Sequence, residues 1–319
     1  MDNRVPKFPA VCIGGSAGAL DPLLKIAGAF PKEFPAAVFI TTHVPPASVS
    51  ALPHILNRAG ALFATHAIDG APIAPGRIFV APPNHHLVLQ TEVMRVLDGP
   101  AENNHRPSID VLFRSASMSF GSGACGVLLS GTLDDGVAGL ISIHEAGGAT
   151  FVQDPDDAQY AGMPNSAIKA GAADGVFPPE RLVEAIRQWM SRPLSIAPPN
   201  VTPRGERYAG NRSIYTCPDC GGTLWELDEE AVLRFKCRSG DASSGHSVLS
   251  TDEQLLESAL RASLRALEER RELLARLMAR SRRNGDSTTS RRFERRSAEV
   301  EIDIEHVRSA LANLFGSRL

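Results

Sequence analysis

VCIGGSAGAL, residues 11–20, joins a short apolar run to a helical pattern through a glycine-rich turn. Similar apolar runs, bounded by glycine, proline or polar residues, recur as far as residue 192. Strands are expected at Val11–Ile13, Ala37–Thr41, Ile78–Ala81 (or this run forms a local hairpin with His86–Gln90), Gly126–Ser130 and Thr150–Gln153. Helices are expected at Ala19–Phe30, Ser48–Ala59, Ser108–Phe120, Gly136–Ala146 and Pro179–Met190. This alternation predicts an α/β fold with a doubly wound, mostly parallel sheet and helices on both faces.

Ser16 lies in the glycine-rich turn and matches the pattern G-x-S-x-G. Glycines on both sides leave its hydroxyl uncrowded, and the helix that follows points free N–H groups at the turn, which suits a developing oxyanion. The simpler interpretation is a serine that caps the helix. A dinucleotide site fits less well, because Ser16 takes the place of the second glycine of G-x-G-x-x-G. The second strand also ends in His43 and not in the acid that would bind a ribose.

Three polar residues follow the ends of different predicted strands, where doubly wound sheets bind their ligands. They are Ser16, His43 and the carboxylate pair Asp134-Asp135. A relay of hydroxyl, imidazole and carboxylate is the arrangement that activates a serine nucleophile. Their order, serine then histidine then aspartate, differs from the order in α/β-hydrolases. The chain is therefore expected to share the chemistry of those enzymes but not their fold.

Five motifs in this order resemble the catalytic domain of the chemotaxis protein-glutamate methylesterase family, CheB. They are IGGSAG around Ser16, THVPP around His43, HRPSIDVLF from residue 105, LLSGTLDDG ending at residue 136 and VQDPDDAQYAGMP from residue 152. The resemblance implies a catalytic triad of Ser16, His43 and Asp135, with Asp134 a neighbour outside the relay. It also implies an oxyanion site near the backbone N–H groups of Ala17 and Thr132.

The implied reaction is hydrolysis of glutamate γ-methyl esters on chemoreceptors or related methylated signalling proteins, which releases methanol, with glutamine deamidation as a second activity. It needs no cofactor. Family members usually begin with a receiver domain, which is expected to be absent here because the first strand starts near residue 10. The loop before Asp135 also differs, since Gly131-Thr132-Leu133 stands where Gly-Met-Gly is usual. These departures leave substrate preference and regulation open.

Arg106 and Ser108 precede the predicted helix at 108–120. The favoured interpretation is structural, with Ser108 as the helix cap. Alternatively, Arg106 lines the cleft and orients a substrate carboxylate.

The composition places the chain among globular proteins, with 319 residues, 43% hydrophobic and a formal net charge of −3. No apolar run is long enough to span a bilayer, and the N-terminus lacks the apolar region of a signal peptide. We therefore expect a cytoplasmic protein that neither inserts into membranes nor binds nucleic acid. Cys12 and Cys125 lie in predicted strands and are expected to be inert core residues.

The other three cysteines lie beyond a proline-rich linker expected at 193–212. Cys217 and Cys220 form a C-P-x-C-G-G knuckle, and Cys237 follows. This spacing is typical of structural zinc, which takes four ligands. Asp241 stands where similar tails tend to carry histidine, so the fourth ligand is either Asp241 or His246, or the site is degenerate. A redox function for the C-x-x-C pair is the less favoured alternative.

The expected organisation is a catalytic domain at 1–192, the linker at 193–212, a zinc-ribbon-like module at 213–250 and a helical region at 251–319. Thr251 and Gln254 are expected to form a capping box at the start of a first helix. A second helix is expected from about Ser290 to Phe315, after a break at Asn284-Gly285-Asp286. The two helices form either an antiparallel hairpin or a coiled coil that associates with a second copy. The alternatives to the methylesterase are a non-catalytic signalling scaffold and an esterase for another carboxyl ester.

Overall fold

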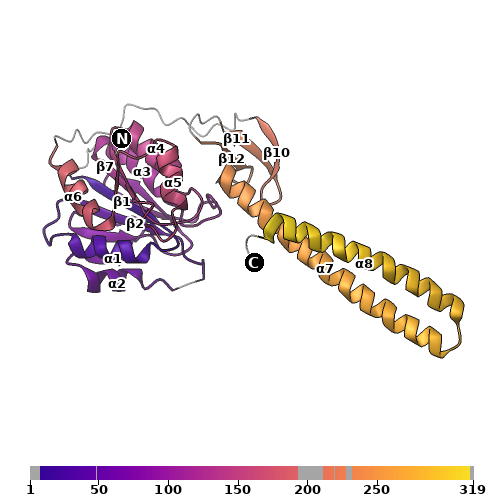
Figure 1. Cartoon of the computed structure of the whole chain (residues 1–319). Coiled ribbons are helices and arrows are strands. Elements are labelled where there is room, and N and C mark those ends of the chain that lie inside the picture. The colour runs from indigo at the N-terminus through magenta and orange to yellow at the C-terminus, as the bar shows by residue number, and fades with distance from the viewer. Residues whose placement is uncertain (1–7, 48, 193–210, 219, 228–231, 317–319) are drawn as a thin grey trace. The chain divides into compact units, whose positions relative to one another are not determined.

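The computed structural model describes residues 8–47, 49–192, 211–218, 220–227 and 232–316 (Figure 1). The chain divides into two compact units, Met1–Val248 and Leu249–Leu319. The predicted linker at 193–212 lies outside the described residues apart from its last two positions, and Arg212 already belongs to a strand.

A seven-stranded sheet forms the centre of the first unit, in the order β3-β4-β2-β1-β7-β8-β9. Every pairing in it is parallel, which confirms the predicted fold class. The strands are β1 (Ala10–Gly15), β2 (Ala37–Thr42), β3 (Phe63–His66), β4 (Arg77–Val80), β7 (Ala124–Leu128), β8 (Ala149–Gln153) and β9 (Gly175–Phe177). The carboxyl ends of β2, β1 and β7 are therefore neighbours at one edge.

Helices cover both faces of this sheet (Figure 1). One face carries α1 (Leu20–Ala29), α2 (Leu52–Ala59) and α6 (Pro179–Met190), and the other carries α3 (Ile109–Phe120), α4 (Val137–Glu145) and α5 (Gly162–Lys169). Successive residues of a strand point to opposite faces, so Val11 packs into the first core and Cys12 into the second. Because both faces are covered, the central strands are apolar without interruption.

The hairpin interpretation of residues 78–90 is wrong. β4 pairs with β2 and β3 in the large sheet, whereas β5 (His86–Gln90) pairs antiparallel with β6 (Val93–Leu97). The sequence predictions also missed β3, β9 and α5. β3 is an edge strand that begins with the exposed Phe63, and β9 has only three residues, so neither shows the long buried run of a central strand.

A four-stranded sheet, in the order β10-β11-β12-β13, completes the first unit. Its strands are β10 (Arg212–Thr216), β11 (Thr223–Leu227), β12 (Arg234–Cys237) and β13 (Ala242–Ser244), and the described pairings are antiparallel. Its small core contains Cys217, Leu224, Phe235, Cys237 and Val248.

The second unit contains α7 (Gly245–Arg283) from Leu249 onward and α8 (Ser287–Phe315), two helices joined by a short turn. The predicted capping box is wrong, because α7 begins at Gly245 and Thr251 lies inside it. Asp286 caps α8 and accepts from the Thr289 backbone N–H at 3.0 Å. Leu274, Val300 and Ile304 pack between the helices. Ion pairs between the helices, such as Arg308–Glu268 at 2.8 Å, lie at the surface.

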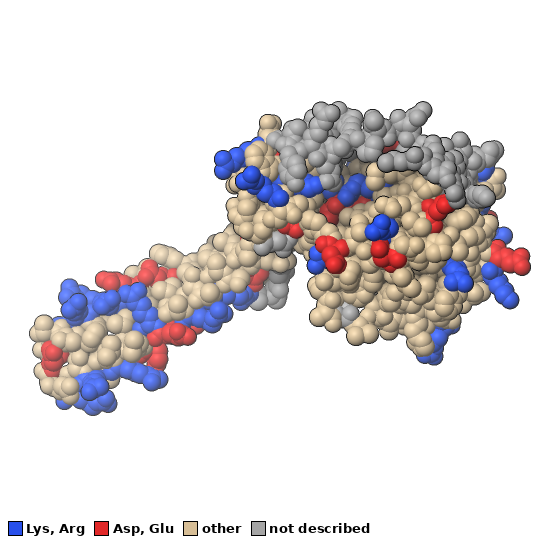
Figure 2. Space-filling view, turned by 180° about the vertical axis from the view of Figure 1, so that it is seen from behind, with Lys and Arg blue, Asp and Glu red and all other residues tan. Residues whose placement is uncertain are grey.

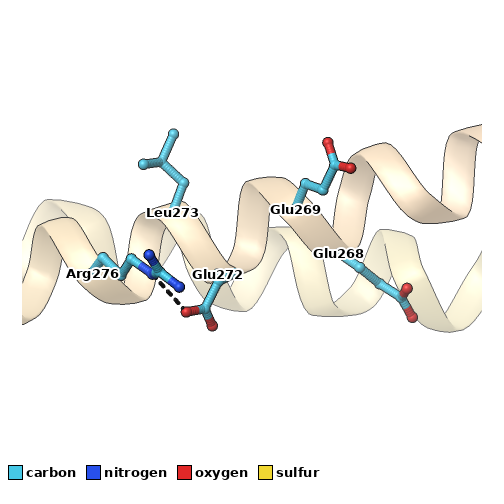
Figure 3. Close-up of a pocket in the computed structure, with 5 residues that line it drawn as sticks. All are labelled: Glu268, Glu269, Glu272, Leu273 and Arg276. Carbon is cyan, nitrogen blue, oxygen red and sulfur yellow. Dashed lines mark hydrogen bonds and ion pairs between the residues drawn. The ribbon is translucent and has the colours of Figure 1, made fainter.

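Both signs of charge are interspersed along this helical pair (Figure 2). A shallow hollow on α7 is lined by Glu268, Glu269, Glu272, Leu273 and Arg276 (Figure 3). Arg276 there pairs with Glu272 at 2.8 Å, one turn away. Mixed charge of this kind is typical of a solvated helix surface. Among the described residues, no helix combines the length and the apolar character needed to cross a membrane.

Candidate active site

Ser16 sits directly beyond the end of β1, in a turn that the backbone of its neighbours holds. Its N–H donates to the carbonyl of Ser130, beyond β7, at 2.9 Å. Gly18 has φ +76°, a conformation that favours glycine. A Cβ on Gly131 would lie 3.0 Å from the Cβ of Ser16 and 2.0 Å from the Met163 sulfur. Glycine at position 131 therefore allows the loop after β7 to approach the serine closely.

The structure brings the three predicted triad residues together. The Nδ1 of His43 lies 3.0 Å from the Oγ of Ser16, and its Nε2 lies 2.7 Å from the Oδ2 of Asp135. The carboxylate therefore favours the tautomer with the proton on Nε2, which leaves Nδ1 free to accept the serine proton. The side chains of His43 and Asp135 are 8% and 2% exposed, which strengthens their interaction relative to one in water.

Asp135 is held by more than His43. It accepts from the Ser108 hydroxyl at 2.9 Å, the Ile109 backbone N–H at 2.7 Å and the Asn103 amide at 2.9 Å. Burial acts to raise the pKa of Asp135. The hydrogen bond from His43 and the Ile109 backbone N–H are among the interactions that outweigh burial and hold the pKa of Asp135 well below its usual range. The relay carboxylate is therefore ionised and fixed in orientation.

The prediction for Ser108 is only partly right. Ser108 occupies the N-cap position of α3, but its side chain makes no capping hydrogen bond and is directed to Asp135. Asp135 in turn accepts from the first N–H of that helix, so a carboxylate distant in sequence takes the place of the cap. Neither Ser108 nor Asn103 was identified from the sequence as a partner of the triad.

His105 stacks on the imidazole of His43, with the ring centroids 3.5 Å apart and the planes 16° apart. Burial, followed by the nearby His43, lowers the pKa of His105 from 6.5 to about 4. His105 is therefore neutral near pH 7, and its uncharged ring covers one face of the His43 imidazole. The HRPS motif contains this residue, but its position against the triad was not predicted.

Replacing His105 by phenylalanine is expected to weaken the pH dependence of stability. Between its unfolded pKa of 6.5 and its folded pKa of about 4, His105 gains a proton only when the chain unfolds. The unfolding free energy of the wild type therefore falls as pH falls through this window, and phenylalanine removes that contribution while keeping a flat ring.

Urea denaturation of both proteins at about pH 7 and about pH 4.5 measures the difference in slope. Asp110, whose pKa burial and the charge of Asp135 raise to about 7, is present in both proteins and does not affect the comparison. Equal slopes would show that His105 titrates normally in the folded chain.

Ala17 and Thr132, the predicted oxyanion donors, flank the nucleophile from two loops. Within the described part of the chain, neither backbone N–H has a hydrogen-bond acceptor. Leu133 beside them has φ +62°, a strained conformation for a residue with a side chain. Unpaired N–H groups in the two loops that meet at Ser16 are available to an oxyanion.

Arg106 is engaged inside the protein. Its Nη2 and Nε donate to the side-chain oxygen of Asn84 at 2.8 and 3.1 Å, and its Nη1 donates to the Gly99 carbonyl at 2.8 Å. These contacts join the segment before β5 to the segment before α3. They correspond to the structural interpretation of Arg106.

The second cluster of chemically active side chains lies in the four-stranded sheet. The ligand atoms of Cys217, Cys220, Cys237 and Asp241 all lie within 4.8 Å of one another. His246 does not join them, so its predicted alternative as the fourth ligand is wrong. Its Nδ1 instead lies 3.0 Å from the Oδ2 of Asp134.

The comparisons with known proteins concern the first unit. A family model for CheB methylesterase matches residues 11–186. The chain is 40% identical over 180 residues to "Protein-glutamate methylesterase/protein-glutamine glutaminase 2" of Rhodospirillum rubrum. This alignment covers 55% of this chain and 49% of that protein. A related protein of Hahella chejuensis is 37% identical over 183 residues, covering 56% and 50%. The chain spans about half the length of the curated relatives it matches.

A solved structure agrees with these matches. The crystal structure of the Thermotoga maritima CheB methylesterase catalytic domain aligns with a TM-score of 0.56 and 30% identity. The alignment covers 57% of this chain and 98% of that one. The likeness therefore includes nearly all of that domain.

Proposed function

Because the chain belongs to the CheB methylesterase family, we propose that it is a serine carboxylic ester hydrolase that removes methyl groups from glutamate γ-methyl esters of a chemoreceptor. The observation that carries this proposal is the relay from Ser16 through His43 to Asp135, with both hydrogen bonds at 3.0 Å or less. A scaffold without catalytic function would not require this geometry.

The geometry supports the following reaction. The Oγ of Ser16 attacks the ester carbonyl carbon while the Nδ1 of His43 takes the serine proton. Asp135 stabilises the imidazolium, and the N–H groups of Ala17 and Thr132 bind the oxyanion. His43 then protonates the leaving methoxide. Methanol departs, and the glutamyl group remains bound to the Oγ of Ser16 as an ester. A water molecule, deprotonated by His43, hydrolyses that ester and releases glutamate.

Glutamine deamidation is a second reaction of the same site. It follows the same acyl-enzyme path, with ammonia leaving in place of methanol. The names of the curated relatives pair the two activities. The substrate we propose is a methylated receptor on the cytoplasmic side of the membrane.

Methanol release from receptor-containing membranes that carry labelled methyl groups tests the substrate. Wild-type protein is expected to release methanol, and the Ser16→Ala variant is not. Release that is equal with the two proteins would contradict the proposed nucleophile. If the wild type hydrolyses a simple aryl ester through Ser16 but not the receptor ester, the esterase acts on another substrate.

A further inference from the structure

The cysteine cluster is built from two turns that face each other. In the first, the Cys217 N–H donates to the Gly222 carbonyl at 2.7 Å and the Gly221 N–H to the Cys217 carbonyl at 2.9 Å. In the second, the Cys237 N–H donates to the Asp241 carbonyl at 2.9 Å. The two turns lie at the same end of the small sheet, where Leu224 pairs with Cys237, and they bring their ligand atoms together.

The donor set is suited to zinc. Tetrahedral coordination with Zn–S bonds of about 2.3 Å requires roughly 3.8 Å between sulfur atoms, close to the spread of this cluster. The Oδ2 of Asp241 lies 3.1 Å from the sulfur of Cys237 and 3.9 Å from that of Cys217. All three cysteines are free thiols, and two of them are buried. Three thiolates and one carboxylate form a closed four-ligand set, which is typical of a structural ion.

The segment directly after Asp241 contacts Asn103, the residue whose side-chain amide donates to Asp135. The Asn103 N–H donates to the Ala242 carbonyl at 2.8 Å, and the Ser244 N–H donates to the Asn103 side-chain oxygen at 2.8 Å. The other end of the Asn103 amide donates to Asp135 at 2.9 Å. Asn103 is 2% exposed and has φ +52°, so the surrounding bonds hold it in a strained conformation.

Two further contacts fasten the same segment beside the relay. The Ser244 hydroxyl donates to the Oδ1 of Asp134 at 2.7 Å, and His246 contacts the Oδ2 of the same carboxylate. Buried Glu102 pairs with Arg114 of α3 and with Arg234 of β12. Asp134 is the neighbour of the catalytic Asp135, and Glu102 is the neighbour of Asn103. The small sheet therefore contacts the sequence neighbours of both Asp135 and Asn103.

We propose that Cys217, Cys220, Cys237 and Asp241 bind one zinc ion, and that the zinc-bound turns position Asp135 through Ser244 and Asn103. Zinc fixes Asp241, and Asp241 fixes the start of β13. β13 then orients the amide that donates to the catalytic carboxylate. The positioning of Asp135 rests on the triad of the proposed function, whereas zinc binding does not depend on it.

Metal content of the full-length protein tests the ion directly. Protein purified under reducing conditions is expected to hold about one zinc per chain, and cobalt in its place to show thiolate-to-cobalt charge-transfer absorption. Cys217→Ser and Cys237→Ser are expected to lose both signals. Cys125→Ala, which removes a buried thiol outside the cluster, is expected to keep them, and Asp241→His to bind zinc more tightly. Zinc retained by Cys217→Ser, or a wild type that binds no cobalt, would overturn the site.

Labelling of Ser16 by a fluorophosphonate probe tests the positioning without any receptor substrate. In this reaction the Oγ of Ser16 displaces fluoride from phosphorus, and His43 takes the serine proton. Removal of zinc is expected to lower the maximal labelling rate about tenfold, with the half-saturating probe concentration unchanged, and added zinc to restore the rate.

Ser244→Ala separates positioning from metal loss, because it removes the hydroxyl bond to Asp134 that fastens this segment beside Asp135 and leaves the zinc ligands in place. It is expected to keep zinc and lower the maximal labelling rate, and Ser244→Thr is expected to restore that rate because it keeps the hydroxyl. Wild-type labelling by the zinc-free protein, or no labelling of the wild type, would overturn the positioning function. Strong zinc-dependent labelling without methanol release would instead contradict the receptor substrate and leave this inference supported.

Discussion

Replacing Ser16 by alanine is expected to lower kcat for ester hydrolysis by on the order of 10^4-fold or more. The substitution removes the oxygen that forms the acyl-enzyme, and no other described hydroxyl contacts the free Nδ1 of His43. Alanine fits the turn, because the Ser16 N–H and its bond to Ser130 remain. The variant should therefore fold normally, with an unchanged melting temperature.

The lowered kcat of Ser16→Ala is measured by steady-state hydrolysis of an aryl ester and by single-turnover release of methanol. Ser130→Ala is the matched control, since it removes a hydroxyl that donates to the Ala17 carbonyl at 2.8 Å but takes no part in the relay. The control is expected to lose far less activity than Ser16→Ala. An activity of Ser16→Ala within tenfold of the wild type would require a different nucleophile.

Asp135→Asn is expected to lower kcat by about 10^3- to 10^4-fold while KM changes little. An amide NH₂ at this position would donate to the Nε2 of His43 and force its proton onto Nδ1, which faces Ser16. The histidine then cannot accept the serine proton. The amide also lacks the charge that stabilises the imidazolium during attack.

Asp134→Asn is the control, because the two carboxylates are adjacent in sequence and both are buried. Asp134 contacts Ser244 and His246, so its amide variant is expected to lose about tenfold or less through the positioning contacts. If Asp134→Asn were as inactive as Asp135→Asn, the assignment of the relay carboxylate would fail. Thermal unfolding of both variants separates this effect from loss of the fold.

The fold class and the candidates Ser16, His43 and the pair Asp134-Asp135 could be predicted from the sequence because they depend on local patterns, whereas the choice of Asp135 came from the family resemblance. Apolar runs mark the central strands, and Ser16, His43 and Asp135 each follow a strand end within a distinctive motif. Parallel strands place such ends at one edge of the sheet, so the motifs can be assembled without coordinates.

The contacts around the triad could not be predicted, because they join segments with no shared pattern. Asn103 lies in an irregular segment, and Ser244 is 141 positions beyond it, yet they share a hydrogen bond. The stacking of His105 on His43 depends on the path of the loop before α3. His246 was a reasonable metal ligand by spacing alone, but its contact with Asp134 depends on how β13 packs.

The order of strands β2-β1-β7 has a consequence for how this chain folds during synthesis. His43 and Asp135 come from strands on either side of β1 and are 92 positions apart in the chain. β7 pairs with β1, with Ala10 opposite Ala124, and strands so far apart in the chain pair slowly because the entropy of closing the loop between them must first be lost. We therefore expect a chain emerging from the ribosome to contain Ser16 long before Asp135, and to complete the relay only when β7 pairs with β1.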